Sequence, residues 1–226
     1  MLLIRAEILA IVAILTLVPS SVQAAEHPSE RWEDEIEQFE SLDSELAPPP
    51  GCILFTGSSS IRMWDLRQHM PKLQAVNRGF GGSQMRDVLY YADRLVIRHE
   101  PRIIVIYEGD NDIASGRKVE DVAADYVKFA KYVHAKLPKT KILFLSIKPS
   151  IARLQLFPKM HEVNMEVAKF CRQADYCRFI DVASVLVDGQ GLPRKELFER
   201  DGLHLNDDGY KLWDQIVAKA IAEIDK

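Results

Sequence analysis

The amino-acid sequence predicts an α/β fold, a three-layer α/β/α sandwich around a mainly parallel, five-stranded sheet. The first observation is a set of short apolar runs such as Ile103-Ile104-Val105-Ile106. Such runs are typical of strands that are buried on both faces. The second observation is that longer segments with helical periodicity separate the runs, which favours parallel strands joined by crossover helices. In such folds, functional residues are expected in the turns that follow the carboxyl ends of the strands.

The first predicted element of this domain is an amphipathic helix over residues 31–46. Its apolar residues recur at steps of three and four among acidic residues, which predicts that the helix packs on the domain surface. These apolar residues are Trp32, Ile36, Phe39, Leu42 and Leu46. Three prolines and Gly51 follow, and they end the helix.

Strands and helices then alternate as far as the C-terminus. The strands are expected at residues 52–56, 75–77, 103–107, 142–147 and 179–182. The intervening helices, each with an apolar stripe, are expected at residues 85–98, 119–137 and 160–174. Asn206 is a favourable N-cap for the last helix, whose first turn carries two aspartates that suit the helix dipole.

The first 24 residues differ in composition from the rest of the chain. Arg5 precedes an apolar run, and the small residues Val22 and Ala24 fit a signal-peptidase site. We therefore expect a signal peptide over residues 1–24, cleavage near Ala24, and a secreted or periplasmic protein. The alternative is a retained membrane anchor, although the apolar run is shorter than the roughly 20 residues that span a bilayer.

Residues 25–226 are expected to form a single domain, because their number suits one α/β domain with a sizeable core. The formal net charge is −4 and the basic residues are scattered, so nucleic acid is not an expected partner. Two alternatives stay open for the three cysteines: Cys171 and Cys177 form a disulfide that leaves Cys52 over, or all three are buried thiols. No Cys/His cluster has zinc spacing, so no structural metal is expected.

Three turns after predicted strands carry residues that could act on a carbonyl group. Gly57 precedes three serines, and a serine in such a turn can expose its hydroxyl and its backbone N–H to the same space. The glycine-rich loop at 79–82 lets the backbone approach a ligand closely. Asn111, after the third strand, could donate its amide to a developing oxyanion. Each motif also has a simpler interpretation, as a helix cap, a tight turn or an Asx turn.

An Asp-x-x-His motif lies just before the last helix. Asp201 precedes His204 by three residues, a spacing that lets the carboxylate orient the imidazole while the other ring nitrogen faces a nucleophile. Taken alone, the motif is also compatible with ordinary surface polar residues that lead into a helix.

Together, these four blocks resemble the SGNH/GDSL hydrolase family, which carries Ser, Gly, Asn and an Asp-x-x-His pair in this order. The resemblance extends from Cys52 to the C-terminal helix. It implies a flavodoxin-like SGNH hydrolase fold of the GDSL-type esterase/lipase kind. It also implies the catalytic residues Ser59, Asp201 and His204, and the oxyanion donors Ser59, Gly82 and Asn111.

The sequence departs from the family pattern at one position beside the nucleophile. The usual Gly-Asp-Ser is replaced by Gly57-Ser58-Ser59, so an acid is missing there. An alignment without gaps that also matches Trp64 favours Ser59 over its two serine neighbours, which we expect to support the turn.

The expected activity is hydrolysis of a carboxylic ester through an acyl-enzyme on Ser59, without cofactor or metal. One alternative is a metal-dependent phosphoesterase that uses Asp110, Asp112, Asp201 and His204. The other is a catalytically silent carbohydrate-binding module on the same fold.

The substrate classes implied by the resemblance are a short-chain acyl ester, an acetylated sugar or a lysophospholipid. Loop 148–158 follows the fourth strand and could line the substrate pocket, or it could be an ordinary packed loop. The residues that raise this question are Ile151, Arg153, Leu156 and Phe157.

Overall fold

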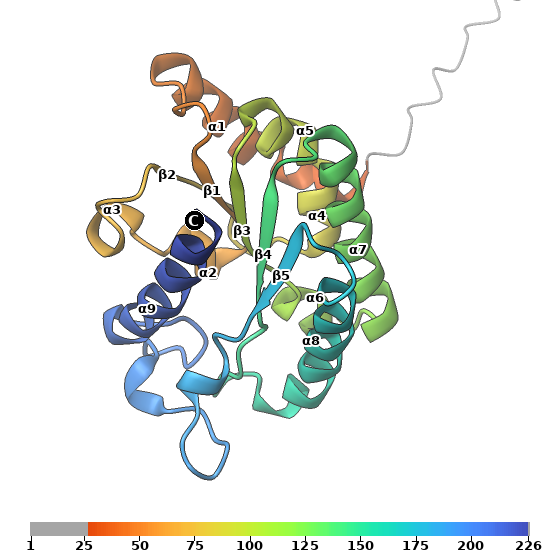
Figure 1. Cartoon of the computed structure of the whole chain (residues 1–226). Helices are drawn as coiled ribbons and strands as arrows, with labels where there is room; N and C mark the ends of the chain where they lie inside the picture. Colours follow the sequence, from red (N-terminus) through yellow and green to blue (C-terminus); the bar gives the residue numbers. More distant parts are fainter. Residues whose placement is uncertain (1–26, 226) are drawn as a thin grey trace, which may run out of the picture.

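A five-stranded, all-parallel sheet forms the centre of the protein, whose computed structural model describes residues 27–225. The strand order is β2-β1-β3-β4-β5, and Figure 1 shows the strands between two layers of helices. The strands are β1 Ile53–Gly57, β2 Ala75–Gly79, β3 Ile103–Tyr107, β4 Lys141–Leu145 and β5 Cys177–Ile180. The predicted α/β/α sandwich with a parallel five-stranded sheet is therefore confirmed. The predicted signal peptide, residues 1–24, lies outside the described residues.

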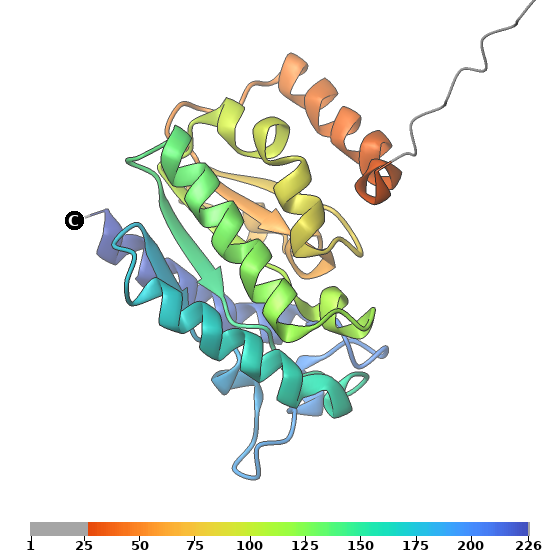
Figure 2. The same ribbon diagram turned by 90° about the vertical axis from the view of Figure 1, so that its right-hand side faces the viewer.

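One face of the sheet is covered by α1 Glu33–Glu45, α4 Met85–Tyr90, α5 Ala92–Leu95, α7 Val119–Lys136 and α8 Phe157–Cys171. The other face is covered by α2 Ser59–Arg62, α3 Leu66–His69 and α9 Asp207–Ile224. Figure 2 looks onto the layer of α7 and α8, with α9 behind the sheet. The short helix α6, Asp110–Ala114, follows β3, and the 3-10 helices are η1 Pro28–Trp32, η2 Ile97–His99, η3 Leu154–Leu156, η4 Ser184–Leu186 and η5 Lys195–Leu197.

Successive side chains of each strand point to opposite faces of the sheet, so the core has two halves. In β3, Ile104 and Ile106 pack under α7, whereas Ile103 and Val105 pack under α9. Both sets are fully buried, as the unbroken apolar run predicts for a strand covered on both faces. None of the helices described between residues 27 and 225 is both long and apolar enough to cross a bilayer.

The predicted helix over 85–98 is wrong as a continuous element, because the chain forms α4, α5 and η2 instead. The first break is at Tyr91, whose ring is buried and whose hydroxyl donates to the carbonyl of Ser29 at 3.0 Å. The packing of Tyr91 on the N-terminal segment therefore outweighs the local helical periodicity. By contrast, the last helix begins as predicted, since the Asn206 side chain accepts a hydrogen bond from the backbone N–H of Gly209.

The N-terminal helix is held against the sheet by buried polar contacts as well as by its apolar face. Ile36 is fully buried in the core. Asp87, also fully buried, accepts hydrogen bonds from Ser29 Oγ at 2.7 Å and from Trp32 Nε1 at 3.2 Å. At the other end of α1, Asp43 pairs with the buried Arg78 of β2. These contacts fix one side of the cleft described below.

The three cysteines are free thiols in the structure. Cys52 and Cys177 are buried and Cys171 is partly buried. A hydrogen bond joins Cys171 to Cys177, and it lowers the pKa of the Cys171 thiol. Of the two sequence alternatives, the structure therefore has the thiol form.

Candidate active site

Ser59 begins α2 immediately after the central strand β1. Gly57 ends that strand with φ of +132°, and the Ser58 N–H donates to the carbonyl of Tyr107 on the neighbouring strand at 3.2 Å. The chain can therefore turn sharply enough for Ser59 to lie at the carboxyl edge of the sheet, half-buried at the mouth of a cleft. This is the position that the strand-to-turn pattern predicts.

His204 meets Ser59 across 145 residues of sequence, and Asp201 contacts the far side of the imidazole. The imidazole Nε2 lies 2.9 Å from Ser59 Oγ, and Nδ1 lies 2.6 Å from an Asp201 carboxylate oxygen. The second Asp201 oxygen accepts the backbone N–H groups of Leu203 at 2.9 Å and of His204 at 3.0 Å. The backbone of its own loop thus fixes one oxygen of the carboxylate, and the other oxygen contacts the imidazole.

The charge state of Asp201 follows from these bonds. Its partial burial would raise the pKa, but the hydrogen bonds from the Leu203 and His204 N–H groups and from the imidazole outweigh burial and lower the pKa of Asp201 to about 2. Asp201 is consequently ionised at neutral pH, where it accepts the Nδ1 proton and leaves Nε2 free to take a proton.

Gly82 and Asn111 line the same cleft as Ser59 and His204, in a cavity of about 620 Å³. Gly82 has φ of +82°, a backbone conformation that favours glycine. A Cβ atom at Gly82 would lie 3.3 Å from the Trp32 ring, so the N-terminal segment closes this side. The remaining lining residues are Glu35, Gln38, Arg62, Gly81, Arg153 and Leu203. The structure therefore brings all five residues of the predicted site together.

A buried lysine lies beneath the turn that carries Ser59, and the sequence patterns did not predict it. The Lys148 side chain is completely buried, with Nζ 3.3 Å from Ser60 Oγ, 3.3 Å from Tyr107 Oη and 3.6 Å from an Asp110 oxygen. Burial lowers the pKa of Lys148, and the Asp110 carboxylate opposes that shift. The signal that could have found it is a lysine that directly follows the fourth apolar run, where a parallel strand ends.

Behind the glycine loop, Glu108 is a buried carboxyl group. Burial, together with the nearby Asp112 carboxylate, raises the pKa of Glu108 well above its usual value. Its oxygen lies 2.5 Å from Ser83 Oγ, and Ser83 Oγ lies 2.9 Å from the Phe80 carbonyl. The Ser83 hydroxyl therefore lies between two acceptors, the Glu108 carboxyl oxygen and the Phe80 carbonyl. This chain of bonds holds the loop that carries Gly82.

The four residues of the metal hypothesis do not converge on one point. Asp112 is fully buried, accepts the Met85 backbone N–H and pairs with Arg117 at 2.7 Å. Asp110 pairs with Arg153 and lies near Lys148. Both carboxylates are therefore already neutralised by cationic side chains, and within residues 27–225 no group of three Asp, Glu, His or Cys residues could hold a metal ion.

The loop at 148–158 partly lines the cleft and partly packs on the core, so each of the two sequence alternatives holds for some of its residues. Arg153 lines the cleft, whereas Leu156 and Phe157 pack against the core. The helix α8 begins at Phe157, earlier than predicted, because Pro158 occupies its first turn, where a proline costs no hydrogen bond. The loop thus contributes one charged side chain to the site and anchors itself with its apolar residues.

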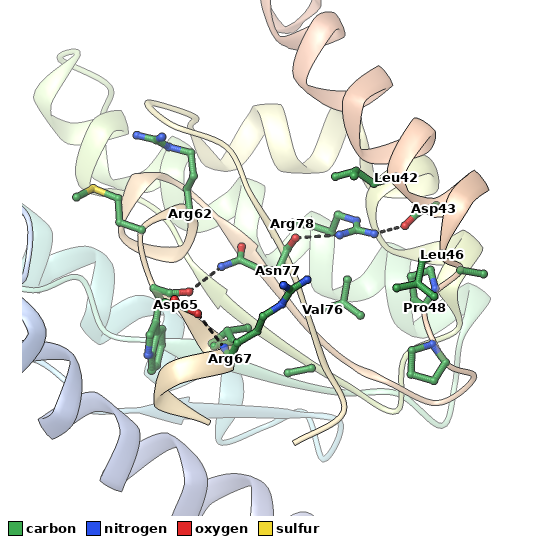
Figure 3. A pocket seen from close by; sticks show the side chains of 16 residues that line it. Leu42, Asp43, Leu46, Pro48, Arg62, Asp65, Arg67, Val76, Asn77 and Arg78 are labelled. Carbon is green, nitrogen blue, oxygen red and sulfur yellow. Dashed lines mark hydrogen bonds and ion pairs between the residues drawn. The ribbon is translucent and has the colours of Figure 1, made fainter. Parts of the chain in front are cut away.

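A second cavity of about 660 Å³ adjoins the cleft, and Arg62 lines both. Figure 3 shows it between α1 and the edge strand β2, with Leu42 and Leu46 on one side and Asp65 and Asn77 on the other. Two of its polar side chains bond to the protein itself: Asp65 caps α3, and the Asn77 amide donates to the carbonyls of Ile61 in α2 and of Trp64 just after it. Ser59 and His204 line the smaller cleft and do not line this cavity.

Replacing Asp201 by asparagine is expected to lower kcat by about 10²- to 10⁴-fold. The asparagine oxygen would keep the backbone bonds, but its N–H₂ group would then face Nδ1. That contact favours the tautomer with the proton on Nε2, which cannot accept the Ser59 proton. The measurement is kcat for ester hydrolysis. The matched control is Asp208→Asn, an exposed change on α9, and equal kcat for the two variants would contradict the orienting role.

Known proteins resemble this chain in sequence and in fold. A model of the GDSL-like lipase/acylhydrolase family matches residues 55–212. An N-acylneuraminate cytidylyltransferase of Escherichia coli O18:K1:H7 is 26% identical over 172 residues, and the match covers 75% of this chain but only 40% of that protein. The chain therefore spans less than half the length of this curated relative.

Solved structures share the fold at lower identity. A GDSL-like lipase from Bacteroides thetaiotaomicron is 19% identical, with a TM-score of 0.74 over 83% of this chain and 97% of that one. An acetylxylan esterase from Geobacillus stearothermophilus is 14% identical, with a TM-score of 0.62 over 76% and 94% of the two chains. In both cases the shared fold covers almost the full length of the other protein.

Proposed function

Because the chain belongs to the GDSL-like lipase/acylhydrolase family, we propose that it is a serine esterase which hydrolyses small carboxylic esters. The single observation that supports this proposal best is the unbroken chain of hydrogen bonds from Asp201 through His204 to Ser59 at the mouth of a cleft. A serine hydroxyl is a weak nucleophile by itself, and an adjacent base held by a third group is what activates it.

In the proposed mechanism, Ser59 Oγ attacks the ester carbonyl while His204 Nε2 takes its proton. Asp201 holds the imidazole in the required tautomer and stabilises the imidazolium that forms. The developing oxyanion receives hydrogen bonds from the backbone N–H groups of Ser59 and Gly82 and from the Asn111 amide. His204 returns its proton to the leaving alcohol, then activates a water that hydrolyses the acyl-enzyme. No step requires a metal or an organic cofactor.

The proposed substrates are short-chain acyl esters on a soluble carrier, with acetylated sugars and lysophospholipids as the classes to compare. The cleft supports a polar carrier, because charged and amide side chains from three elements line it: Glu35, Gln38, Arg62 and Arg153. The acetylxylan esterase that shares the fold is named for its action on an acetylated carbohydrate. We also propose that the protein is secreted or periplasmic after cleavage near Ala24, which fractionation and N-terminal sequencing would test.

A fluorophosphonate probe tests the serine mechanism directly. The purified protein is expected to be labelled at Ser59, and its turnover of p-nitrophenyl acetate is expected to be blocked by the probe and unaffected by a chelator. Activity that a chelator abolishes and that the probe leaves intact would favour the metal-dependent phosphoesterase. No turnover on any ester from acetyl to palmitoyl or on acetylated sugars, together with tight glycan binding, would favour the silent module.

A further inference from the structure

The side chain of Asn111 is held at both ends of its amide group. Its Nδ2 donates to the Ser83 carbonyl at 2.9 Å, and its Oδ1 accepts a hydrogen bond from Arg153 Nη1 at 3.0 Å. A guanidinium group has only donors and a carbonyl is only an acceptor, so these two partners permit a single orientation of the amide. One Nδ2 hydrogen is used by Ser83, and the other remains available in the cleft that Asn111 lines.

Arg153 is itself fixed by a buried ion-pair chain. Its Nη1 also donates to Asp110, whose second oxygen lies 3.6 Å from Lys148 Nζ. The Asp110 side chain is 7% exposed and that of Lys148 is fully buried, whereas that of Arg153 is 23% exposed. Hydrogen bonds between ionised groups with little access to water are stronger than exposed ones. The chain therefore gives the Arg153 guanidinium a defined place even though its outer part reaches the cleft.

We propose that Arg153 is a positioning residue, which aims the free Asn111 N–H at the ester oxygen through its bond to Asn111 Oδ1. This inference rests on the proposed esterase function. Oxyanion stabilisation depends on donors that are already oriented when charge develops, since reorientation during the reaction would cost part of their benefit. In the absence of Arg153, the Asn111 amide keeps only the Ser83 bond and can rotate away from the productive direction.

A double-mutant cycle on Arg153 and Asn111 tests the inference. Arg153→Met keeps the length of the side chain and removes its donors, and we expect kcat to fall about 10-fold with KM changed by less than about threefold. Asn111→Ala is expected to lower kcat about 10²- to 10³-fold, as the loss of one oxyanion donor does in other enzymes. The combined variant should then match Asn111→Ala within about threefold, because Arg153 acts through a side chain that is no longer there.

The opposite outcomes overturn the proposal. A loss of more than about threefold when Arg153→Met is added to Asn111→Ala would show that Arg153 acts independently. A rise in KM for an anionic ester, with kcat unchanged, would show that Arg153 contacts the substrate instead. Arg153→Lys, which keeps the charge and one donor, should recover part of the lost kcat and offers a second reading if the methionine variant folds poorly.

The matched control is Arg67→Met on α3. Arg67 is exposed, and no side-chain hydrogen bond or ion pair is found for it among residues 27–225, so kcat is expected to stay at the level of the unmodified protein. Failure of this inference is distinct from failure of the proposed function. If the unmodified protein hydrolyses esters but the cycle is additive, only the role of Arg153 is wrong; if Ser59→Ala remains active, the esterase mechanism is wrong.

Discussion

The variant Ser59→Ala is expected to lose about 10⁴- to 10⁶-fold in kcat for ester hydrolysis while it keeps the fold. His204 Nε2 lies 2.9 Å from Ser59 Oγ, so the Ser59 hydroxyl is placed to lose its proton to the imidazole and form the acyl-enzyme. Alanine removes a half-buried oxygen at the cleft and no core contact, so the thermal unfolding midpoint should change by less than about 3 °C. The measurements are kcat from single-substrate kinetics and unfolding followed by circular dichroism.

The neighbouring Ser58 provides the matched control, because it is one of the two other serines in the same turn that an alternative alignment could select. Ser58 is buried, and among residues 27–225 the serine hydroxyl found within hydrogen-bond distance of His204 Nε2 is that of Ser59, at 2.9 Å. Ser58→Ala should therefore keep the fluorophosphonate labelling that Ser59→Ala loses. A folded Ser59→Ala variant with more than about one tenth of the original kcat would exclude Ser59 as the nucleophile.

Local patterns predicted the parts of the site that depend on short stretches of sequence. The apolar runs located the strands, and the parallel sheet that they imply placed Ser59, Gly82 and Asn111 at one edge. The Asp201 and His204 pair is also local, because its geometry is set within a single loop whose backbone N–H groups hold the carboxylate. These features follow from periodicity, turn chemistry and topology.

The residues that the sequence did not predict are those whose environment arises only from tertiary packing. Lys148 follows a strand and could as easily have been exposed, but the turn of Ser60 and the ring of Tyr107 enclose it. The hydrogen bond from Arg153 to Asn111 joins side chains 42 residues apart. Likewise, the end of α4 at Tyr91 depends on a contact with Ser29. The hydrophobic periodicity of a single segment cannot predict such contacts, because they depend on how separate helices, strands and loops pack together.

The change Gly57→Ala is expected to prevent folding or to destabilise the protein by more than about 4 kcal/mol, a large part of the 5–15 kcal/mol that stabilises a typical domain. A Cβ atom at Gly57 would lie 2.1 Å from the carbonyl oxygen of Tyr107 and 2.9 Å from its carbonyl carbon. Both strands are in the middle of the sheet, paired in register at these two residues. The overlap is with backbone, so no side-chain rotation can relieve it.

The conformation of Gly57 adds to the cost, since φ of +132° is strained for any residue with a Cβ atom. The carbonyl of Gly57 also accepts the Phe80 N–H at 2.9 Å, and the next residue donates to Tyr107. A backbone shift that relieved the overlap would therefore disturb the start of the glycine loop and the position of Ser59 together. Any folded fraction of Gly57→Ala should accordingly have reduced kcat as well as reduced stability.

The matched control is Gly189→Ala, where a Cβ atom would meet nothing within 4 Å and the backbone is not in the left-handed region. Its unfolding free energy should change by less than about 1 kcal/mol. An increase in stability is the expected direction, because alanine lowers the conformational entropy of the unfolded chain. Thermal unfolding of the two variants, with soluble yield as a second measure, distinguishes steric overlap from a general effect of glycine replacement. A midpoint for Gly57→Ala within about 2 °C of the original protein would mean that β1 and β3 can separate at this point without loss, contrary to the close backbone contact at Tyr107.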